Sequence, residues 1–293
     1  MASLRDIRRR IKSVKNTSQI TKAMQMVAAS KMRKAQLAAL NGMPYAAMLN
    51  RILVSLRDRV DRSLHPLLAK REGGRQIVIL LSTDKGLCGA LNTNLFREVL
   101  NLDKDTTDFI SVGRKGTQFL ARSGRTMIAE FPLKDHPTFL ETKNISRLAM
   151  ERFLEKKASR VLVCYPRFVN TLNQAITCVP LLPITSLVEA GIELPGQAAA
   201  ADIDGPDDTQ LLIEPDPHSV LDAILPFYVH FELFQLLLST RASEHSARMV
   251  AMKSATDNAK QLVKDLTLEY NKARQASITN EILEIATAQL ALN

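Results

Sequence analysis

The sequence lacks helix-breaking residues at both of its ends. No glycine or proline precedes Gly42 and Pro44, and none follows Pro226, which leaves the first 41 and the last 67 residues without either. Because glycine and proline end or bend helices, each end can form one long helix. Two such helices predict an antiparallel coiled coil. A helical bundle is the alternative, although bundle loops normally contain glycine or proline.

Apolar residues recur at helical spacing in both ends, with alanines between them. The N-terminal stripe comprises Ile7, Ile11, Val14, Ile20, Met24, Val27 and Met32. The C-terminal stripe comprises Phe227, Phe231, Phe234, Leu238, Val250, Leu262, Leu266, Ile278, Ile282 and Ile285. We expect these residues to form a slim seam, since alanine, methionine and serine allow close helix approach.

The middle of the chain holds ten of the eleven glycines, between Gly73 and Gly205. Apolar, β-branched runs predict strands at 76–82, 108–113, 125–131, 160–165 and 173–182. Helical segments are expected near 92–101, 114–122 and 143–158. This alternation predicts an α/β domain with a mostly parallel sheet covered on both faces. The predicted organisation is a helix over 1–58, an α/β domain over 75–188, a linker over 189–210 and a helix over 211–293.

Cysteine is scarce, and no uninterrupted apolar run approaches the ~18–20 residues of a membrane span. Cys88, Cys164 and Cys178 follow no metal-ligand spacing and lie in or beside apolar runs. We therefore expect reduced, buried thiols and a cytosolic-type compartment. A Cys164–Cys178 disulfide is the disfavoured alternative, because the two strands need not be neighbours.

Acidic residues are almost absent from the N-terminal end. Residues 1–40 contain ten lysines and arginines against Asp6 alone, an excess equal to the net charge of +9 of the whole chain. Three explanations remain open at this point: a cleaved transit peptide, a helix that binds DNA or a membrane, or a helix that faces an acidic protein partner.

Catalytic motifs are absent as well. The glycine turn "DKGLCGALN" follows a predicted strand, but Ala90 and Leu91 stand where a Walker loop needs lysine and serine or threonine. Gly86 and Gly89 give only GxxG, one glycine short of the dinucleotide pattern. The five histidines are scattered singly, and no GxSxG occurs. We expect a structural turn here, with no catalytic residue, no metal site and no cofactor.

Three blocks of sequence point further. They are "IRRRIKSVKNTSQITKAMQMVAASKMRKAQ" (7–36), "STDKGLCGALNTNLF" (82–96) and "SEHSARMVAMKSATDNAKQL…YNKARQASITNEILEI" (243–285). In this order they resemble the gamma subunit of bacterial F-type ATP synthases, and the resemblance covers nearly the whole chain. It implies a non-catalytic rotor shaft whose terminal helices form an antiparallel coiled coil, and whose Rossmann-like domain binds no nucleotide.

The resemblance also implies the partners. They are the alpha and beta subunits, the epsilon subunit and the c-ring, with proton flow turning ring and shaft. Membrane association is expected only through the complex, at the cytoplasmic face of the bacterial inner membrane. The basic end then faces an acidic protein, and the transit-peptide explanation fails because the match begins within the first ten residues.

The resemblance further implies partner-binding residues. Arg274 and Gln275, with Thr279 nearby, match hydrogen-bond partners of a beta-subunit loop, and Lys22 and Met24 match positions that face an acidic lever of that subunit. A further candidate is Arg248.

Two rival hypotheses come from the residues themselves. A nucleic-acid-binding coiled-coil protein would use the basic end, although aromatic residues are not interleaved there. A free-standing nucleotide enzyme would use the glycine turn, although the required lysine and third glycine are missing.

Overall fold

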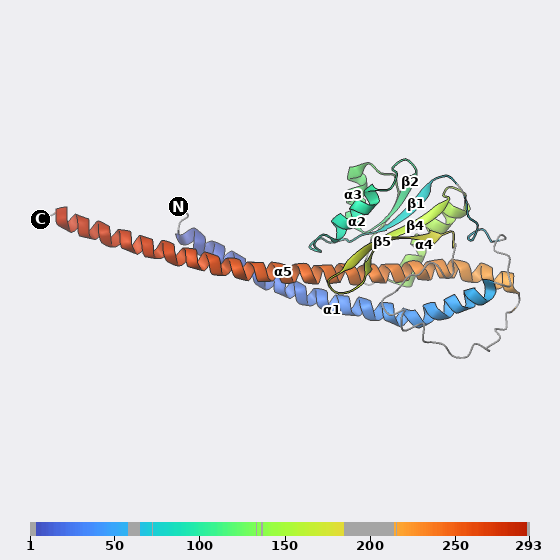
Figure 1. The fold of residues 1–293 in the computed structure, drawn as a ribbon, viewed down its shortest axis with the longest axis horizontal. Helices are drawn as coiled ribbons and strands as arrows, with labels where there is room; N and C mark the ends of the chain where they lie inside the picture. Colours follow the sequence, from blue (N-terminus) through green and yellow to red (C-terminus); the bar gives the residue numbers. More distant parts are fainter. Residues whose placement is uncertain are drawn as a thin grey trace. The chain divides into compact units, whose positions relative to one another are not determined.

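The structure, a computed structural model, describes residues 4–57, 65–71, 73–132, 134–135, 137–184, 214 and 216–291. The chain divides into two compact units: residues 1–28 with 249–293, and residues 29–248. Helices α1 (Leu4–Arg57) and α5 (Pro217–Ala291) each belong to both units (Figure 1). The predicted linker at 189–210 lies outside the described residues.

The two long helices predicted from the breaker-free ends are confirmed, at 54 and 75 residues. Both continue through a proline, Pro44 in α1 and Pro226 in α5, although proline removes a backbone donor. Aromatic packing beside the prolines accounts for this continuity. Tyr45 lies with its ring centroid 5.8 Å from that of Phe227 and 5.1 Å from that of Phe231, so tertiary contacts hold both helices where local propensity would end them.

Helix α5 contains an 18-residue window that is long and apolar enough, by composition alone, to cross a membrane. Its mean hydropathy is 1.4, and 56% of the window is buried inside the protein. Buried leucines of α5 pack against the sheet, among them Leu233, Leu236 and Leu237. The apolar character of this helix is therefore that of a core helix.

All five predicted strands and the three shorter helices are present in unit 2, which comprises residues 29–248. The strands are β1 (Gln76–Leu81), β2 (Thr107–Val112), β3 (Met127–Phe131), β4 (Arg160–Phe168) and β5 (Gln174–Leu182). The helices are α2 (Leu91–Leu100), α3 (Arg114–Ser123) and α4 (Phe139–Leu154). The sheet order is β3-β2-β1-β4-β5, with β5 antiparallel to β4 and the other neighbours parallel.

The sheet is covered on both faces, as predicted (Figure 1). Side chains of β1 alternate between the two: Val78 and Leu80 pack with residues of α2 and α3. On the other face, Ile77, Ile79 and Leu81 pack with residues of α4 and α5. Because β1 is central and buried throughout, its sequence after Gln76 is a continuous apolar run without polar alternation.

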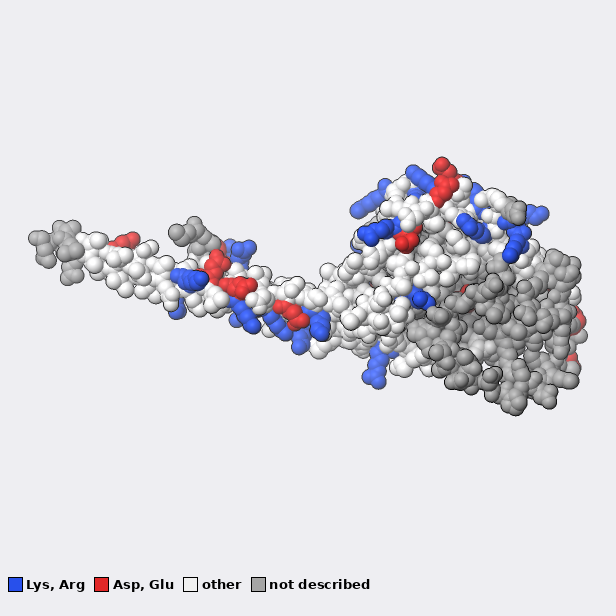
Figure 2. Space-filling view, viewed as in Figure 1, with Lys and Arg blue, Asp and Glu red and all other residues white. Residues whose placement is uncertain are grey.

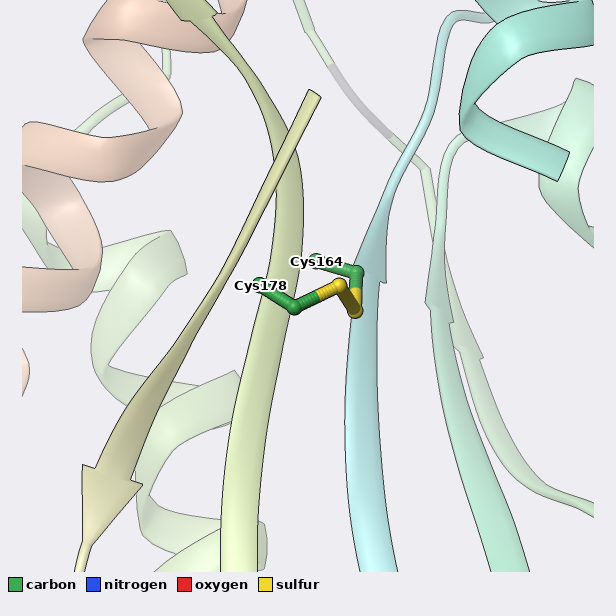
Figure 3. Close-up of a disulfide and its surroundings, with 2 residues drawn as sticks. All are labelled: Cys164 and Cys178. Atoms are coloured by element: carbon green, nitrogen blue, oxygen red, sulfur yellow. A yellow bond between two sulfur atoms is a disulfide. The ribbon is translucent and has the colours of Figure 1, made fainter. Parts of the chain in front are cut away.

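The expectation of three reduced cysteines is wrong for two of them. β4 and β5 form neighbouring antiparallel strands, and Cys164 lies directly opposite Cys178 with 4.1 Å between the Cα atoms. Figure 3 shows their side chains joined as a disulfide. Cys88 is free and buried, as expected, and burial raises the pKa of its thiol. Spacing alone did not reveal the pairing, because it requires knowing that β5 turns back on β4.

The disulfide predicts a specific thiol count. Protein denatured in N-ethylmaleimide without reductant should gain one adduct, on Cys88, and three adducts after reduction with a dithiol. Reduction should also lower the free energy of unfolding by up to about 3 kcal/mol, because a loop of this length is released in the unfolded chain. Mass spectrometry and urea unfolding measure the two effects. Cys88→Ala is the matched control, and three adducts without reductant would contradict the pairing.

A buried carboxyl group lies on α5 in the same core. Glu232 is only 6% exposed, and its Oε1 has no hydrogen-bond partner among the described residues. Burial raises the pKa of Glu232 to about 8. The folded protein therefore keeps a proton that the unfolded chain releases near pH 4.5. Stability falls as the pH rises between these values, since the unfolded state ionises first.

Replacing Glu232 with glutamine should remove this pH dependence. We expect the stability of Glu232→Gln relative to the wild type to rise by about 3 kcal/mol between pH 5 and pH 8. Urea unfolding of the isolated chain, followed by circular dichroism at both pH values, measures this difference. Glu98→Gln, at an exposed position of α2, is the control. An equal difference at both pH values would show that Glu232 ionises normally in the fold.

Candidate partner-binding surface

Unit 1 is an antiparallel pair formed by the start of α1 and the end of α5. Arg8 donates to the Tyr270 hydroxyl at 2.7 Å, and its guanidinium carbon lies 5.4 Å from the centroid of that ring. Further along, the hydroxyls of Thr21 and Thr256 lie 2.7 Å apart. Positions that advance along α1 therefore meet positions that recede along α5, and the predicted antiparallel coiled coil is confirmed.

The seam between the helices follows a heptad repeat. On α1 the buried or half-buried residues at this spacing are Ile7, Ile11, Val14, Ser18, Thr21, Gln25 and Ala28. Those on α5 are Met252, Thr256, Ala259, Val263, Leu266, Tyr270, Ala273 and Ser277. Steps of four and three repeat without a break on both helices, which is the spacing of coiled-coil a and d positions. Small and hydroxyl-bearing residues at many of these positions make the pair slim.

Six residues predicted for the seam are exposed instead: Ile20, Val27, Leu262, Ile278, Ile282 and Ile285. Ile20 is 61% exposed and Val27 is 55% exposed, while their neighbours Thr21 and Ala28 face α5. The prediction selected apolar residues, and after Val14 these no longer stand at the heptad positions. Strict continuation of the seven-residue spacing would have found Ser18 and Thr21, because a narrow seam accepts hydroxyl groups.

The predicted partner-binding residues of unit 1 lie mostly on its outer surface. Lys22 is exposed and Met24 half-buried on α1, beside the exposed Ile20. On α5, Arg274, Gln275 and Thr279 are exposed. The Thr279 hydroxyl donates to the Gln275 carbonyl at 2.9 Å, which leaves its oxygen able to accept a bond from outside.

The end of α5 is exposed on every side. All residues from 278 to 287 are exposed, including Ile278, Ile282, Leu283 and Ile285. Figure 2 shows this end of the helix as largely uncharged, whereas lysines and arginines gather further along the helical pair. An exposed apolar helix end of this kind is characteristic of a surface that another protein covers.

Arg248, the remaining predicted site residue, lies in unit 2 and is only 9% exposed. Its guanidinium donates to Glu244 at 2.7 Å and to the carbonyls of Lys85 and Gly86 at 3.3 Å. The Arg248 guanidinium thus binds the glycine turn that follows β1. The turn presents carbonyl oxygens to a cation of its own chain.

The glycine turn connects β1 to α2, and residues beside it bond to the start of α3. Asp84 follows β1 and accepts from the backbone N–H of Arg114 at 2.9 Å, so its carboxylate lies at the N-terminus of α3. Ser82 accepts from the N–H of Gly116 at 2.8 Å. Gly113 has φ of 99°, and a β-carbon there would lie 2.5 Å from the Ser82 carbonyl. The Asp84 carboxylate therefore occupies the position at the N-terminus of α3 where an anion could bind.

Two of the remaining titratable side chains, His65 and His230, each contact a polar side chain of another segment. Among the described residues, no group of three or more His, Cys, Asp and Glu side chains is placed to hold a metal ion. His65 pairs with Asp222 at 3.3 Å, and His230 Nδ1 lies 2.6 Å from the Ser146 hydroxyl. Burial lowers the pKa of both imidazoles. The first contact joins the segment before β1 to the start of α5, and the second joins α4 to α5.

The two units define a class of protein. Its members combine a long antiparallel pair of helices with a doubly wound α/β domain, and the same two helices contribute to both units. The chain matches the family model described as ATP synthase over residues 3–292. It is 51% identical to the ATP synthase gamma chain of Opitutus terrae over 99% of both chains, and 47% identical to that of Methylacidiphilum infernorum over the full length of both. The chain therefore belongs to the family of ATP synthase gamma chains.

Solved structures agree on the fold. A chain of the Euglena gracilis mitochondrial ATP synthase, in its OSCP, F1 and c-ring part, superimposes with a TM-score of 0.66 at 21% identity, covering 99% of this chain and 94% of that one. A chain from the central stalk and c-ring of the Tetrahymena thermophila enzyme gives a TM-score of 0.59 at 22% identity, covering 80% of this chain and 99% of that one.

Proposed function

We propose that this chain is the central rotor shaft of a proton-translocating F-type ATP synthase. It couples rotation of the c-ring to ATP synthesis and hydrolysis at the beta-subunit sites, and it carries no catalytic site of its own. Its partners are the alpha and beta subunits, the epsilon subunit and the c-ring. It lies at the cytoplasmic face of the bacterial inner membrane and is held there through the complex.

The observation that carries this proposal is the exposed end of α5. A shaft must turn inside its partners without being held at one angle, and ion pairs at its tip would favour particular angles. The exposed apolar residues Ile278, Ile282 and Leu283 instead offer contacts that are not directional. A tip of this composition suits a rotating contact within an apolar sleeve.

Polar residues before the tip suit transient, angle-dependent contacts. Arg274 and Gln275 are exposed and offer directional donors, and we assign them, with Thr279, to a beta-subunit loop. Lys22 and Met24 are assigned to an acidic segment of the same subunit. Arg248 is not included in this surface, because its guanidinium is bound within unit 2.

Reconstitution tests the proposal. The purified chain alone should hydrolyse no ATP, whereas its mixture with alpha and beta subunits should turn over rapidly. Deleting residues 249–293 should lower the activity of the mixture at least tenfold, because the part of α5 that belongs to unit 1 is removed. A mixture without this chain is the control. ATP turnover by the isolated chain would refute the proposal and direct attention to the turn at Gly86.

The polar contacts predict a graded effect. Arg274→Ala combined with Gln275→Ala should reduce ATP hydrolysis by the reconstituted complex roughly tenfold, since a hydrogen bond to a charged group contributes about 1.5–3 kcal/mol. Steady-state ATPase assays measure it, with subunit content checked on gels. Lys260→Ala, at an exposed position nearer unit 2, serves as the matched control. Equal activities of the double variant and this control would remove Arg274 and Gln275 from the contact surface.

A further inference from the structure

One stretch of α5 in unit 2 combines complete burial with a polar sequence. All twelve residues from 235 to 246, three turns of helix, are buried. Helices buried on all sides are normally apolar, yet this stretch reads "QLLLSTRASEHS". Buried polar groups are costly unless they form hydrogen bonds. The hydrogen bonds of this stretch therefore identify the segments that hold it in place.

The end of β4 and the turn that follows it bind the stretch on one side. The Ser239 hydroxyl accepts from the backbone N–H of Phe168 at 3.2 Å. About two turns further along the helix, the Ser246 hydroxyl donates to the Thr171 carbonyl at 2.7 Å. Helix α1 lies against the start of the stretch, where Gly42 faces the Gln235 amide so closely that a β-carbon would overlap it.

Two loops at the carboxyl edge of the sheet bind the stretch elsewhere. Arg241 donates to the Lys134 carbonyl in the loop that follows β3. Arg248, just beyond the stretch, donates to the carbonyls of Lys85 and Gly86 in the loop that follows β1. Both arginines therefore fasten α5 to loops of the parallel sheet.

Glu244 connects these two arginines. Its carboxylate accepts from Arg241 through one oxygen and from Arg248, at 2.7 Å, through the other, and its side chain is only 2% exposed. The neighbouring His245 is neutral at pH 7, because burial lowers its pKa to about 4. Glu244 is thus the negative charge within α5 that orients both guanidinium groups toward their loops.

We propose that Ser239, Arg241, Glu244, Ser246 and Arg248 form a rotational lock, with Glu244 as its positioning residue. The lock fixes the rotation of α5 about its own axis relative to the sheet, so that torque entering the α/β domain is passed to the helix. Turning α5 by one residue would break bonds to the β4–β5 turn and to both loops at once. This inference rests on the proposed rotor function.

Directional bonds explain why the stretch is polar. Apolar packing resists separation of surfaces but sets few constraints on angle, whereas a hydrogen bond weakens steeply when its donor turns away. A set of charged and hydroxyl groups distributed around the helix therefore resists twisting better than leucines of equal burial. The cost of burying the charged groups is offset because Arg241 and Arg248 each bond to a loop carbonyl and Glu244 bonds to both arginines.

The test compares hydrolysis with pumping in the assembled complex. Glu244→Gln preserves the side-chain shape but removes the charge between the arginines. In inverted membrane vesicles, we expect ATP hydrolysis to stay within about twofold of the wild type while ATP-driven proton pumping falls at least threefold. When α5 is fixed to the sheet, its rotation drives the ring. When α5 can rotate relative to the sheet, ATP hydrolysis still turns the helix but the ring is driven less. Glu151→Gln, at an exposed position of α4, is the matched control.

A cross-link distinguishes slipping from misfolding. Thr171→Cys and Ser246→Cys, combined with Glu244→Gln and Cys88→Ser, should restore pumping on oxidation, because the new disulfide joins the β4–β5 turn to α5 covalently. An unchanged ratio of pumping to hydrolysis in Glu244→Gln would overturn the lock. Parallel loss of both activities without rescue by the cross-link would also overturn it. A wild-type complex that neither hydrolyses nor pumps would instead contradict the proposed rotor function.

Discussion

The structure depends on keeping one helix continuous through very different surroundings. Helix α5 covers a face of the sheet, is enclosed by loops at residues 235–246, shares a narrow seam with α1, and ends exposed on every side. Hydrogen bonding within an α-helix satisfies the backbone in all these settings. Only side-chain identity has to change along its length. Pro226 shows how strongly packing favours continuity, because the helix passes through it where its neighbour Phe227 meets Tyr45.

Much of this architecture could be predicted from the sequence, because its strongest signals are local. The absence of glycine and proline indicated both long helices, and apolar runs indicated all five strands. The seam was predicted less well: apolar residues led to Ile20 and Val27, whereas the heptad continues through Ser18 and Thr21. The Cys164–Cys178 pair was missed because it depends on a contact between strands. Exposure of Arg274 and Gln275 agrees with a surface role, while the contacts of Arg248 depend on loops distant in sequence.

The α/β domain uses the carboxyl edge of its sheet for contacts with its own chain. In such folds a ligand binds beyond the carboxyl ends of the strands, where helix N-termini attract anions. Here Asp84 occupies the N-terminus of α3, and Arg248 takes up carbonyls of the glycine turn. The edge that would hold a ligand is used to attach the domain to its own long helix. The glycine-bearing turn therefore resembles a binding loop in sequence while it serves as a structural joint.

Helix α5 buries polar side chains in one unit and exposes apolar side chains in the other. The stretch at 235–246 is polar and buried, whereas residues 278–287 include four large apolar side chains that are exposed. For an isolated chain each arrangement carries a cost, since buried charges need partners and exposed apolar surface orders water. Both are explained if the helix is gripped firmly at one end and turns within other proteins at the opposite end. Directional bonds belong where slipping must be prevented, and non-directional contacts belong where turning must remain free.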